Sequence, residues 1–125
     1  VLAIAGKLLG AGKVKAFDFD AKAVEVAALN IERNQITGIE IFEADVFEWK
    51  NSQRFQVVAA NLFSTVLVEA LPLMTRWIES RGRLILSGIL AEQWEEVLSK
   101  AKECRFQLVS DKKIGKWVTA SFDAP

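Results

Sequence analysis

The stretch Val14–Ile31 reads Val-Lys-Ala-Phe-Asp-Phe-Asp-Ala-Lys-Ala-Val-Glu-Val-Ala-Ala-Leu-Asn-Ile, and its two halves differ in hydrophobic pattern. Val14–Phe19 is short, apolar and bordered by acids, which predicts a buried strand. Asp20 is placed to cap a following helix. The apolar residues of that helix recur at helical spacing: Val24, Ala27, Ala28 and Ile31. A strand followed by an amphipathic helix is the repeating unit of α/β proteins.

The rest of the chain continues this alternation. Further helices are predicted over Val1–Leu9, from Ser64 to about Glu79 and over Ala91–Cys104. Further strands are predicted from Ile39 to near Asp45 and over Phe55–Leu62, Arg83–Ser87, Phe106–Lys112 and Trp117–Phe122. Pro72 predicts a kink or a break in its helix, because proline lacks a backbone N–H. The order predicts an α/β fold with a mostly parallel sheet covered on both faces, and a β-hairpin through Ile114-Gly115-Lys116 at its end.

Composition limits the classes of protein that fit. The 125 residues are 51% hydrophobic and 26% charged, which is typical of one soluble globular domain over residues 1–125. The formal net charge of zero argues against broad capture of nucleic acid or anionic membrane. No apolar run approaches the ~18–20 residues of a membrane span. The single cysteine, Cys104, excludes an intramolecular disulfide and favours a reducing, cytoplasmic location.

The residue inventory also limits the chemistry. The chain contains no His and no Tyr, so it has no Ser-His-Asp triad, no Cys-His dyad and no His-based metal cage. We expect no metal site. Gly6, Gly10 and Gly12 do not match the dinucleotide-binding pattern G-x-G-x-x-G, and we interpret them as a helix end and a turn.

Three predicted strands end in polar residues. Asp18, Asp45 and Asn61 each follow or close a strand, and ligands of open α/β sheets bind beyond the carboxyl ends of the strands. Asp18 is either a ribose-binding acid or a helix cap shared with Asp20, whereas Asp45 alone is more typical of a turn or cap. Asn61 follows a buried run, so its amide is expected to find partners. The lysines Lys112, Lys113 and Lys116 predict a solvated hairpin tip, with an acidic or RNA-bearing partner as the alternative.

The sequence segments around these residues resemble those of a known family. Val14-Lys15-Ala16-Phe17-Asp18-Phe19-Asp20 is similar to the second strand of class I S-adenosylmethionine-dependent methyltransferases. Val58-Ala59-Ala60-Asn61-Leu62, with Gly82-Arg83-Leu84-Ile85-Leu86-Ser87-Gly88-Ile89-Leu90, resembles the PrmA family of ribosomal protein methyltransferases. Gly115-Lys116-Trp117-Val118 resembles that family's last strand.

The resemblance implies a Rossmann-like sheet and S-adenosylmethionine as cofactor. Asp18 would hold the ribose hydroxyls and Phe19 would pack against the adenine. Asp45 would bond the adenine amino group, with Val46 beside the ring. Asn61 would lie by the sulfonium methyl, contribute to the cofactor site and orient the incoming amine, which makes it the candidate catalytic residue. Leu62 would help to wall the acceptor site.

The chain departs from the family pattern in three ways. In the family, a first strand and a glycine-rich loop come before the segment that matches Val1, and they are absent from this sequence. The family's substrate-recognition domain, which lies further upstream, is absent as well. Ser80-Arg81 replaces the usual Lys-Pro. The missing strand would lie between the strands that end at Asp18 and Asn61. We therefore expect a partial methyltransferase domain that, as printed, binds cofactor poorly.

Three functions are compatible with these sequence features. The first is a methyltransferase of protein amines, either lysine or an N-terminal amine, with a protein substrate and neither membrane nor direct nucleic-acid partners. The second is a degenerate, non-catalytic α/β interaction module. The third is a fragment of a nicotinamide-dependent oxidoreductase, which fits Asp18 but not the Asn61-Leu62 context or the absence of Tyr.

Overall fold

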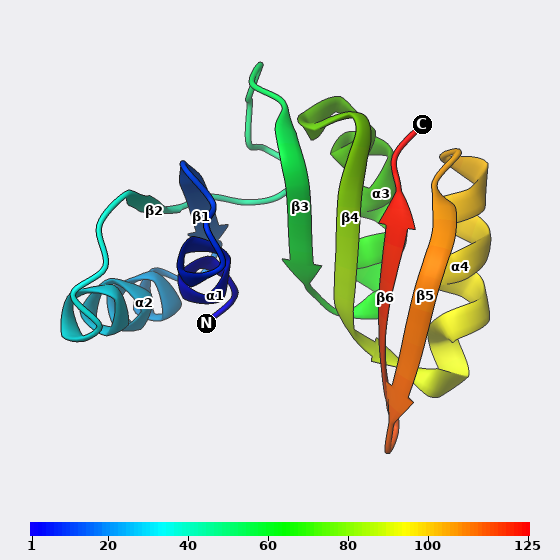
Figure 1. Cartoon of the computed structure of the whole chain (residues 1–125). Helices are drawn as coiled ribbons and strands as arrows, with labels where there is room; N and C mark the ends of the chain where they lie inside the picture. Colours follow the sequence, from blue (N-terminus) through cyan, green and yellow to red (C-terminus); the bar gives the residue numbers. More distant parts are fainter. The chain divides into compact units, whose positions relative to one another are not determined.

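The computed structural model describes all 125 residues, Val1–Pro125. Its elements alternate as the sequence predicts (Figure 1). In chain order they are α1 (Leu2–Leu8), β1 (Val14–Asp18), α2 (Ala21–Arg33), β2 (Ile39–Glu43), β3 (Phe55–Asn61), α3 (Ser64–Trp77), β4 (Ile78–Leu90), the 3₁₀ turn η1 (Ala91–Gln93), α4 (Trp94–Glu103), β5 (Gln107–Ile114) and β6 (Trp117–Asp123). The elements cluster into two compact units, residues Val1–Lys50 and Asn51–Pro125.

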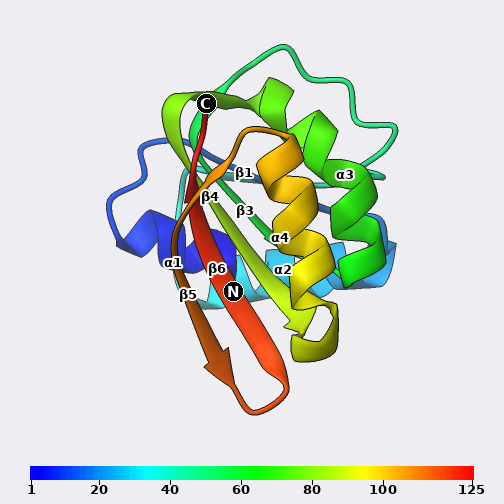
Figure 2. The ribbon, with the colours of Figure 1, turned by 90° about the vertical axis from the view of Figure 1, so that its right-hand side faces the viewer.

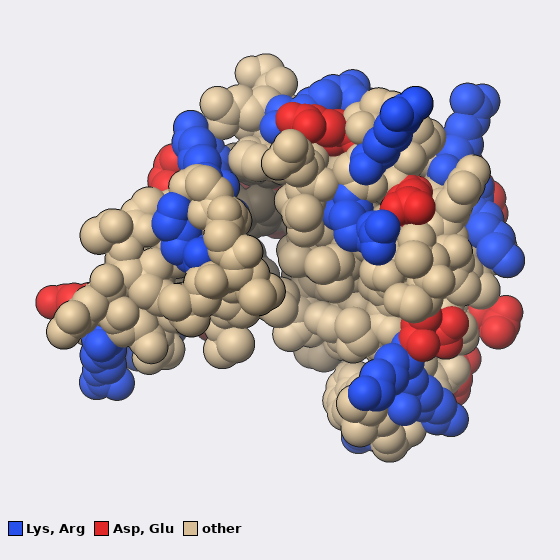
Figure 3. Space-filling view, viewed as in Figure 1, with Lys and Arg blue, Asp and Glu red and all other residues tan.

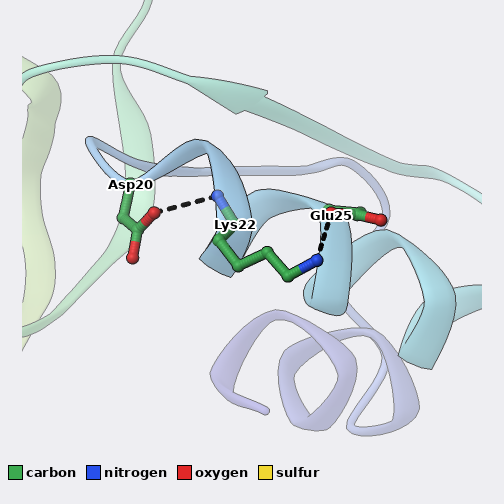
Figure 4. A network of polar contacts seen from close by, with 3 residues as sticks. All are labelled: Asp20, Lys22 and Glu25. Carbon is green, nitrogen blue, oxygen red and sulfur yellow. Dashed lines mark hydrogen bonds and ion pairs between the residues drawn. The ribbon is translucent and has the colours of Figure 1, made fainter.

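The first unit holds a two-stranded parallel sheet. β1 and β2 pair from Val14 opposite Ile39 to Asp18 opposite Glu43, and α1 and α2 both contact the two strands. Asp20 caps α2 as predicted, because its carboxylate accepts a 2.9 Å hydrogen bond from the Lys22 backbone N–H. The Lys22 ammonium reaches Glu25 at 2.9 Å one turn along the helix (Figure 4). These contacts fix where α2 begins and therefore where the β1–α2 loop lies.

The second unit holds a four-stranded sheet in the order β3-β4-β6-β5. β3 and β4 are parallel, whereas β6 is antiparallel to both of its neighbours, β4 and β5. α3 and α4 lie side by side on one face of this sheet (Figures 1 and 2). The core between them consists of alternate strand residues and the inner helix faces. Among its fully buried side chains are Leu67, Leu71, Leu84, Leu86, Val97 and Phe122.

The structure refines three predictions about element boundaries. Of the kink or break predicted at Pro72, the break is absent, since α3 continues to Trp77. β4 begins before the predicted strand Arg83–Ser87, and its added part is irregular, since the register with β3 shifts there and Arg81 adopts a φ of +63°. The hairpin loop is shorter than predicted, because Ile114 still pairs with Trp117. Local sequence rules miss the last two features because strand pairing decides them.

Edge strands are present in both sheets. β1 pairs only with β2, and β3 pairs only with β4, so each of these strands has one unpaired edge. β5 is the other edge of the larger sheet, and every residue from Gln107 to Ile114 is exposed. Figure 3 shows basic side chains gathered over the tip of the β5–β6 hairpin, where Lys112, Lys113 and Lys116 are exposed. No helix is both long and apolar enough to span a membrane.

Candidate functional site

The structure brings two of the predicted site residues to one end of the smaller sheet. Asp18 is the last residue of β1, and Asp45 lies two residues beyond the end of β2. The Ala44 backbone N–H donates to the Asp18 carbonyl at 3.0 Å, which joins the two strand ends. The carboxyl ends of both parallel strands therefore carry an exposed acid, as the sequence predicts.

Each of these acids uses one oxygen to hold its own loop. Asp18 Oδ1 accepts a 3.0 Å hydrogen bond from the Asp20 backbone N–H. Asp45 Oδ1 accepts a 2.8 Å hydrogen bond from the Phe47 N–H. Both acids therefore stabilise turns, whereas Asp20 alone caps α2 and the shared cap role predicted for Asp18 is wrong. Oδ2 of both residues makes no hydrogen bond within the chain, so one oxygen of each carboxylate is available to a ligand hydroxyl or amino group.

Two apolar residues follow these acids directly. Phe19 is 75% exposed, although an aromatic ring of that size usually buries most of its surface. Val46 is half-buried. The neighbouring ring of Phe17 is instead packed against Phe42 and Trp49, with centroids 5.7 and 4.8 Å away. Phe19 is therefore an exposed aromatic residue that directly follows Asp18 in the chain, and an exposed aromatic face can stack on a heteroaromatic ring.

Asn61 ends β3 in the second unit, opposite Ser87 of β4. The expectation that its amide finds partners is wrong, because Asn61 is exposed at the strand end and its side chain makes no hydrogen bond within the chain. Leu62 is half-buried, and α3 begins two residues further on, at Ser64. Asn61 thus presents a free amide, with both a donor and an acceptor, at the carboxyl end of a parallel strand.

Gly88 is a neighbour of Asn61 that the sequence did not identify. A Cβ built on Gly88 would lie 2.5 Å from Asn61 Oδ1 and 3.1 Å from the Leu62 carbonyl oxygen. Two acceptor oxygens of the β3–α3 junction therefore face the same backbone position. The only sign of this proximity in the sequence is a glycine within the run Leu86-Ser87-Gly88-Ile89-Leu90. The run has the pattern of a strand, which does not indicate that Gly88 lies near Asn61.

The remaining candidates do not form a second chemical centre. No group of three or more Cys, Asp or Glu side chains is arranged to hold a metal ion. Cys104 is half-buried at the end of α4, and loss of hydration raises the pKa of its thiol, with Lys100 opposing that shift. A raised thiol pKa lowers the thiolate fraction, which favours a packing role for Cys104 over that of a reactive thiol.

Solved structures of methyltransferases share this fold. A crystal structure of ribosomal protein L11 methylase from Lactobacillus delbrueckii subsp. bulgaricus matches with a TM-score of 0.91 at 26% identity, over 97% of this chain and 62% of that one. N-methyltransferase NodS from Bradyrhizobium japonicum, in complex with S-adenosyl-L-homocysteine, matches with a TM-score of 0.73 at 17% identity, over 90% of this chain and 67% of that one. The predicted α/β, Rossmann-like fold class of the class I methyltransferases is confirmed.

Sequence comparison narrows the class to one family. The model of the family described as ribosomal protein L11 methyltransferase (PrmA) matches residues 1–124. The ribosomal protein L11 methyltransferase of Desulforamulus reducens is 35% identical over 120 residues, which cover 95% of this chain and 39% of that protein. The chain belongs to the PrmA family, and it spans about two fifths of the length of the curated relatives it matches.

Proposed function

We propose that the protein containing this chain transfers a methyl group from S-adenosylmethionine to an amine of a ribosomal protein. The observation that carries the proposal is the family match over residues 1–124. The free carboxylate oxygens of Asp18 and Asp45 and the unbonded amide of Asn61 are consistent with it. A non-catalytic module would need none of these polar groups to stay free.

The strand ends of the first unit supply groups that fit the nucleoside part of the cofactor. Asp18 Oδ2 would accept from the ribose hydroxyls, and a carboxylate acceptor makes such hydrogen bonds stronger than a neutral one does. The exposed ring of Phe19 would cover one face of the adenine, with Val46 beside it. Asp45 Oδ2 would accept from the adenine amino group. Oδ1 of each aspartate holds its loop in place, so the site needs little rearrangement on binding.

The chemistry suits a chain without His or Tyr. When bound, S-adenosylmethionine supplies a methyl group on a positively charged sulfur, which is a good leaving group. Asn61 Oδ1 would accept a hydrogen bond from the incoming amine and direct the nitrogen lone pair. An amide cannot take up a proton at neutral pH, so the amine has to arrive in its neutral form. A water-poor approach lined by Leu62 favours that form by lowering the amine pKa.

The identity of the methyl acceptor is inferred from the relatives and not from the geometry of this chain. The names of the curated relatives make ribosomal protein L11 their substrate, and a lysine or an N-terminal amine of such a protein is the proposed acceptor here. Such a reaction takes place where ribosomes are assembled, in the cytoplasm. We expect no direct contact with nucleic acid, because the chain has a net charge of zero.

The test uses the complete polypeptide that contains this chain. Incubation with methyl-labelled S-adenosylmethionine and separated ribosomal components is expected to label a protein and leave RNA unlabelled. Asp18→Ala is expected to weaken binding of S-adenosylhomocysteine in calorimetry by about 1–3 kcal/mol, because a charge-assisted hydrogen-bond pair to the ribose is lost.

Asp111→Ala is the matched control for this substitution. Asp111 is an exposed aspartate of β5, at the opposite edge of the β3-β4-β6-β5 sheet from Asn61, so removing its carboxylate should leave the affinity unchanged. Equal affinities for the two variants would remove Asp18 from the site. A complete polypeptide that neither binds S-adenosylhomocysteine nor transfers a methyl group would support the non-catalytic module instead.

A further inference from the structure

Gly88 occupies an unusual position in β4. It adopts a φ of +80°, a conformation that side-chain-bearing residues rarely take. The register between β4 and β6 shifts between Leu86 and Ile89, so Gly88 lies in an irregularity of the ladder. Such irregularities bend a strand and redirect its backbone, and they occur often beside functional sites.

The space over Gly88 is filled by the end of β3. A Cβ at this position would lie 2.5 Å from Asn61 Oδ1, 3.1 Å from the Leu62 carbonyl oxygen and 3.5 Å from the Leu62 nitrogen. The first distance is shorter than any normal carbon–oxygen contact, so a side chain here would move the Asn61 amide. The Leu62 carbonyl belongs to the backbone and has less freedom to move.

No hydrogen bond within the chain holds the Asn61 amide in place. Its side chain has no donor or acceptor partner, and the residue is exposed. An exposed asparagine without partners usually samples several rotamers. The absence of a Cβ at Gly88 is therefore what leaves room for Oδ1 in the orientation that the structure shows.

We propose that Gly88 is the positioning residue for Asn61: the missing side chain leaves the space in which the Asn61 amide takes the orientation needed for the acceptor amine. This inference rests on the proposed function for the role of Asn61 in methyl transfer. The contact between the two residues is independent of that role. Gly88 acts only through Asn61 and does not itself touch the reacting atoms.

The kinetic test compares two glycine substitutions in the complete polypeptide. Gly88→Ala is expected to lower kcat for methyl transfer by about tenfold or more, since a misplaced orienting group costs that much. The dissociation constant for S-adenosylhomocysteine should stay within about twofold of the value for the unsubstituted protein, because the substitution leaves the interactions that bind the cofactor in place. A folded Gly88→Ala variant with the kcat of the unsubstituted protein would overturn the proposal.

Gly115→Ala is the matched control. Gly115 also has a positive φ, of +59°, but a Cβ there meets no atom within 4 Å. Both substitutions carry the strain of alanine at positive φ, and only Gly88→Ala meets Asn61. A fall in kcat of equal size in both variants would mean that backbone strain alone is responsible and would refute the positioning role.

A double-mutant cycle tests the contact without any activity. In the 125-residue chain, Gly88→Ala should lower Tm by about 3 °C or more beyond its effect in an Asn61→Ala background, because the clash disappears with the amide. Equal Tm losses in both backgrounds would overturn the proposal. If Gly88→Ala alone prevents folding, Asn61→Ala should restore it, and failure of the double variant to fold would equally overturn the proposal. An absence of methyl transfer by the unsubstituted protein would refute the proposed function and leave this cycle unaffected.

Discussion

Asp18 and Asp45 each have one carboxylate oxygen bound within the chain and one free. In each residue one oxygen holds the loop that follows the strand, at 3.0 Å and 2.8 Å, and the other makes no hydrogen bond within the chain. The sequence posed the structural and the ligand-binding interpretations as alternatives. The structure makes them compatible, because each interpretation needs only one oxygen.

Ser64 is the buried polar side chain that the fold leaves without a partner. It is 3% exposed, and its Oγ makes no hydrogen bond. Burying a hydroxyl without a partner costs about 1–3 kcal/mol. We therefore expect Ser64→Ala to raise the free energy of unfolding by about 1 kcal/mol, measured by urea denaturation at constant m.

Thr65→Ala is the control for Ser64→Ala. Thr65 is the next residue of α3 and is exposed, so its hydroxyl can bond to water, and the substitution should change stability by less than about 0.5 kcal/mol. A loss of stability on Ser64→Ala would show that the hydroxyl has a partner in solution, such as a buried water.

The positions of the strand-end residues could be predicted from the sequence, whereas the residues that surround them could not. Asp18, Asp45 and Asn61 follow apolar runs, so their places at strand ends can be read from the local pattern. The contact between Gly88 and Asn61 joins residues 27 positions apart in the sequence and depends on the register of β3 and β4. No local rule contains that register, so the neighbour of the candidate catalytic residue was not predictable.

α3 shows an element whose tertiary contacts outweigh a local rule. Proline inside a helix removes one hydrogen bond and costs about 3 kcal/mol, yet α3 runs through Pro72 to Trp77. Pro72 is exposed, whereas Leu71 and Met74 of the same helix are buried. Burying those side chains gains about 1.5–3 kcal/mol each, which is sufficient to keep the helix continuous.

α4 gives the chain a pH-dependent feature at its last turn. Partial burial raises the pKa of the Cys104 thiol above its ordinary value, and a hydrogen bond from Lys100 to Glu103 raises the pKa of the Lys100 ammonium. Both groups keep their protons more firmly in the folded chain than in the unfolded chain. Their contribution to stability is present below their unfolded pKa values and is lost as the pH rises through the folded values.

Alkylation of Cys104 measures this shift directly. The rate with iodoacetamide follows the thiolate fraction, so the folded chain should react slowly at neutral pH, with a midpoint above the ordinary value of 9.0. The urea-unfolded chain is the control and should react with the midpoint of a free cysteine. A folded-state midpoint at or below that of the unfolded chain would contradict the raised pKa.

At the scale of the whole molecule, burial is unevenly distributed. All of the fully buried side chains lie between Ala60 and Phe122, and none lies in the unit Val1–Lys50. Local opening costs least where few apolar contacts are lost. The chain therefore has one well-packed core, in the second unit, and a first unit held mainly by hydrogen bonds and half-buried side chains.

Hydrogen exchange is expected to separate the two units. Amides of β4 and β6 should exchange most slowly, because both strands lie inside the larger sheet and carry most of its core. Amides of β1 and β2 should exchange faster by at least about tenfold under the same conditions. Mass spectrometry of peptic peptides gives both rates in one sample, and equal protection of the two sheets would contradict the prediction.

The exposed edge formed by β5 affects how copies of the chain behave in concentrated solution. An unpaired strand edge offers backbone groups to a second copy and promotes aggregation. Here Lys112 and Lys113 lie on that edge, and Lys116 lies in the adjoining loop, all three exposed. Like charges on approaching molecules repel, so these lysines act as a barrier to self-association in a protein whose overall charge is zero.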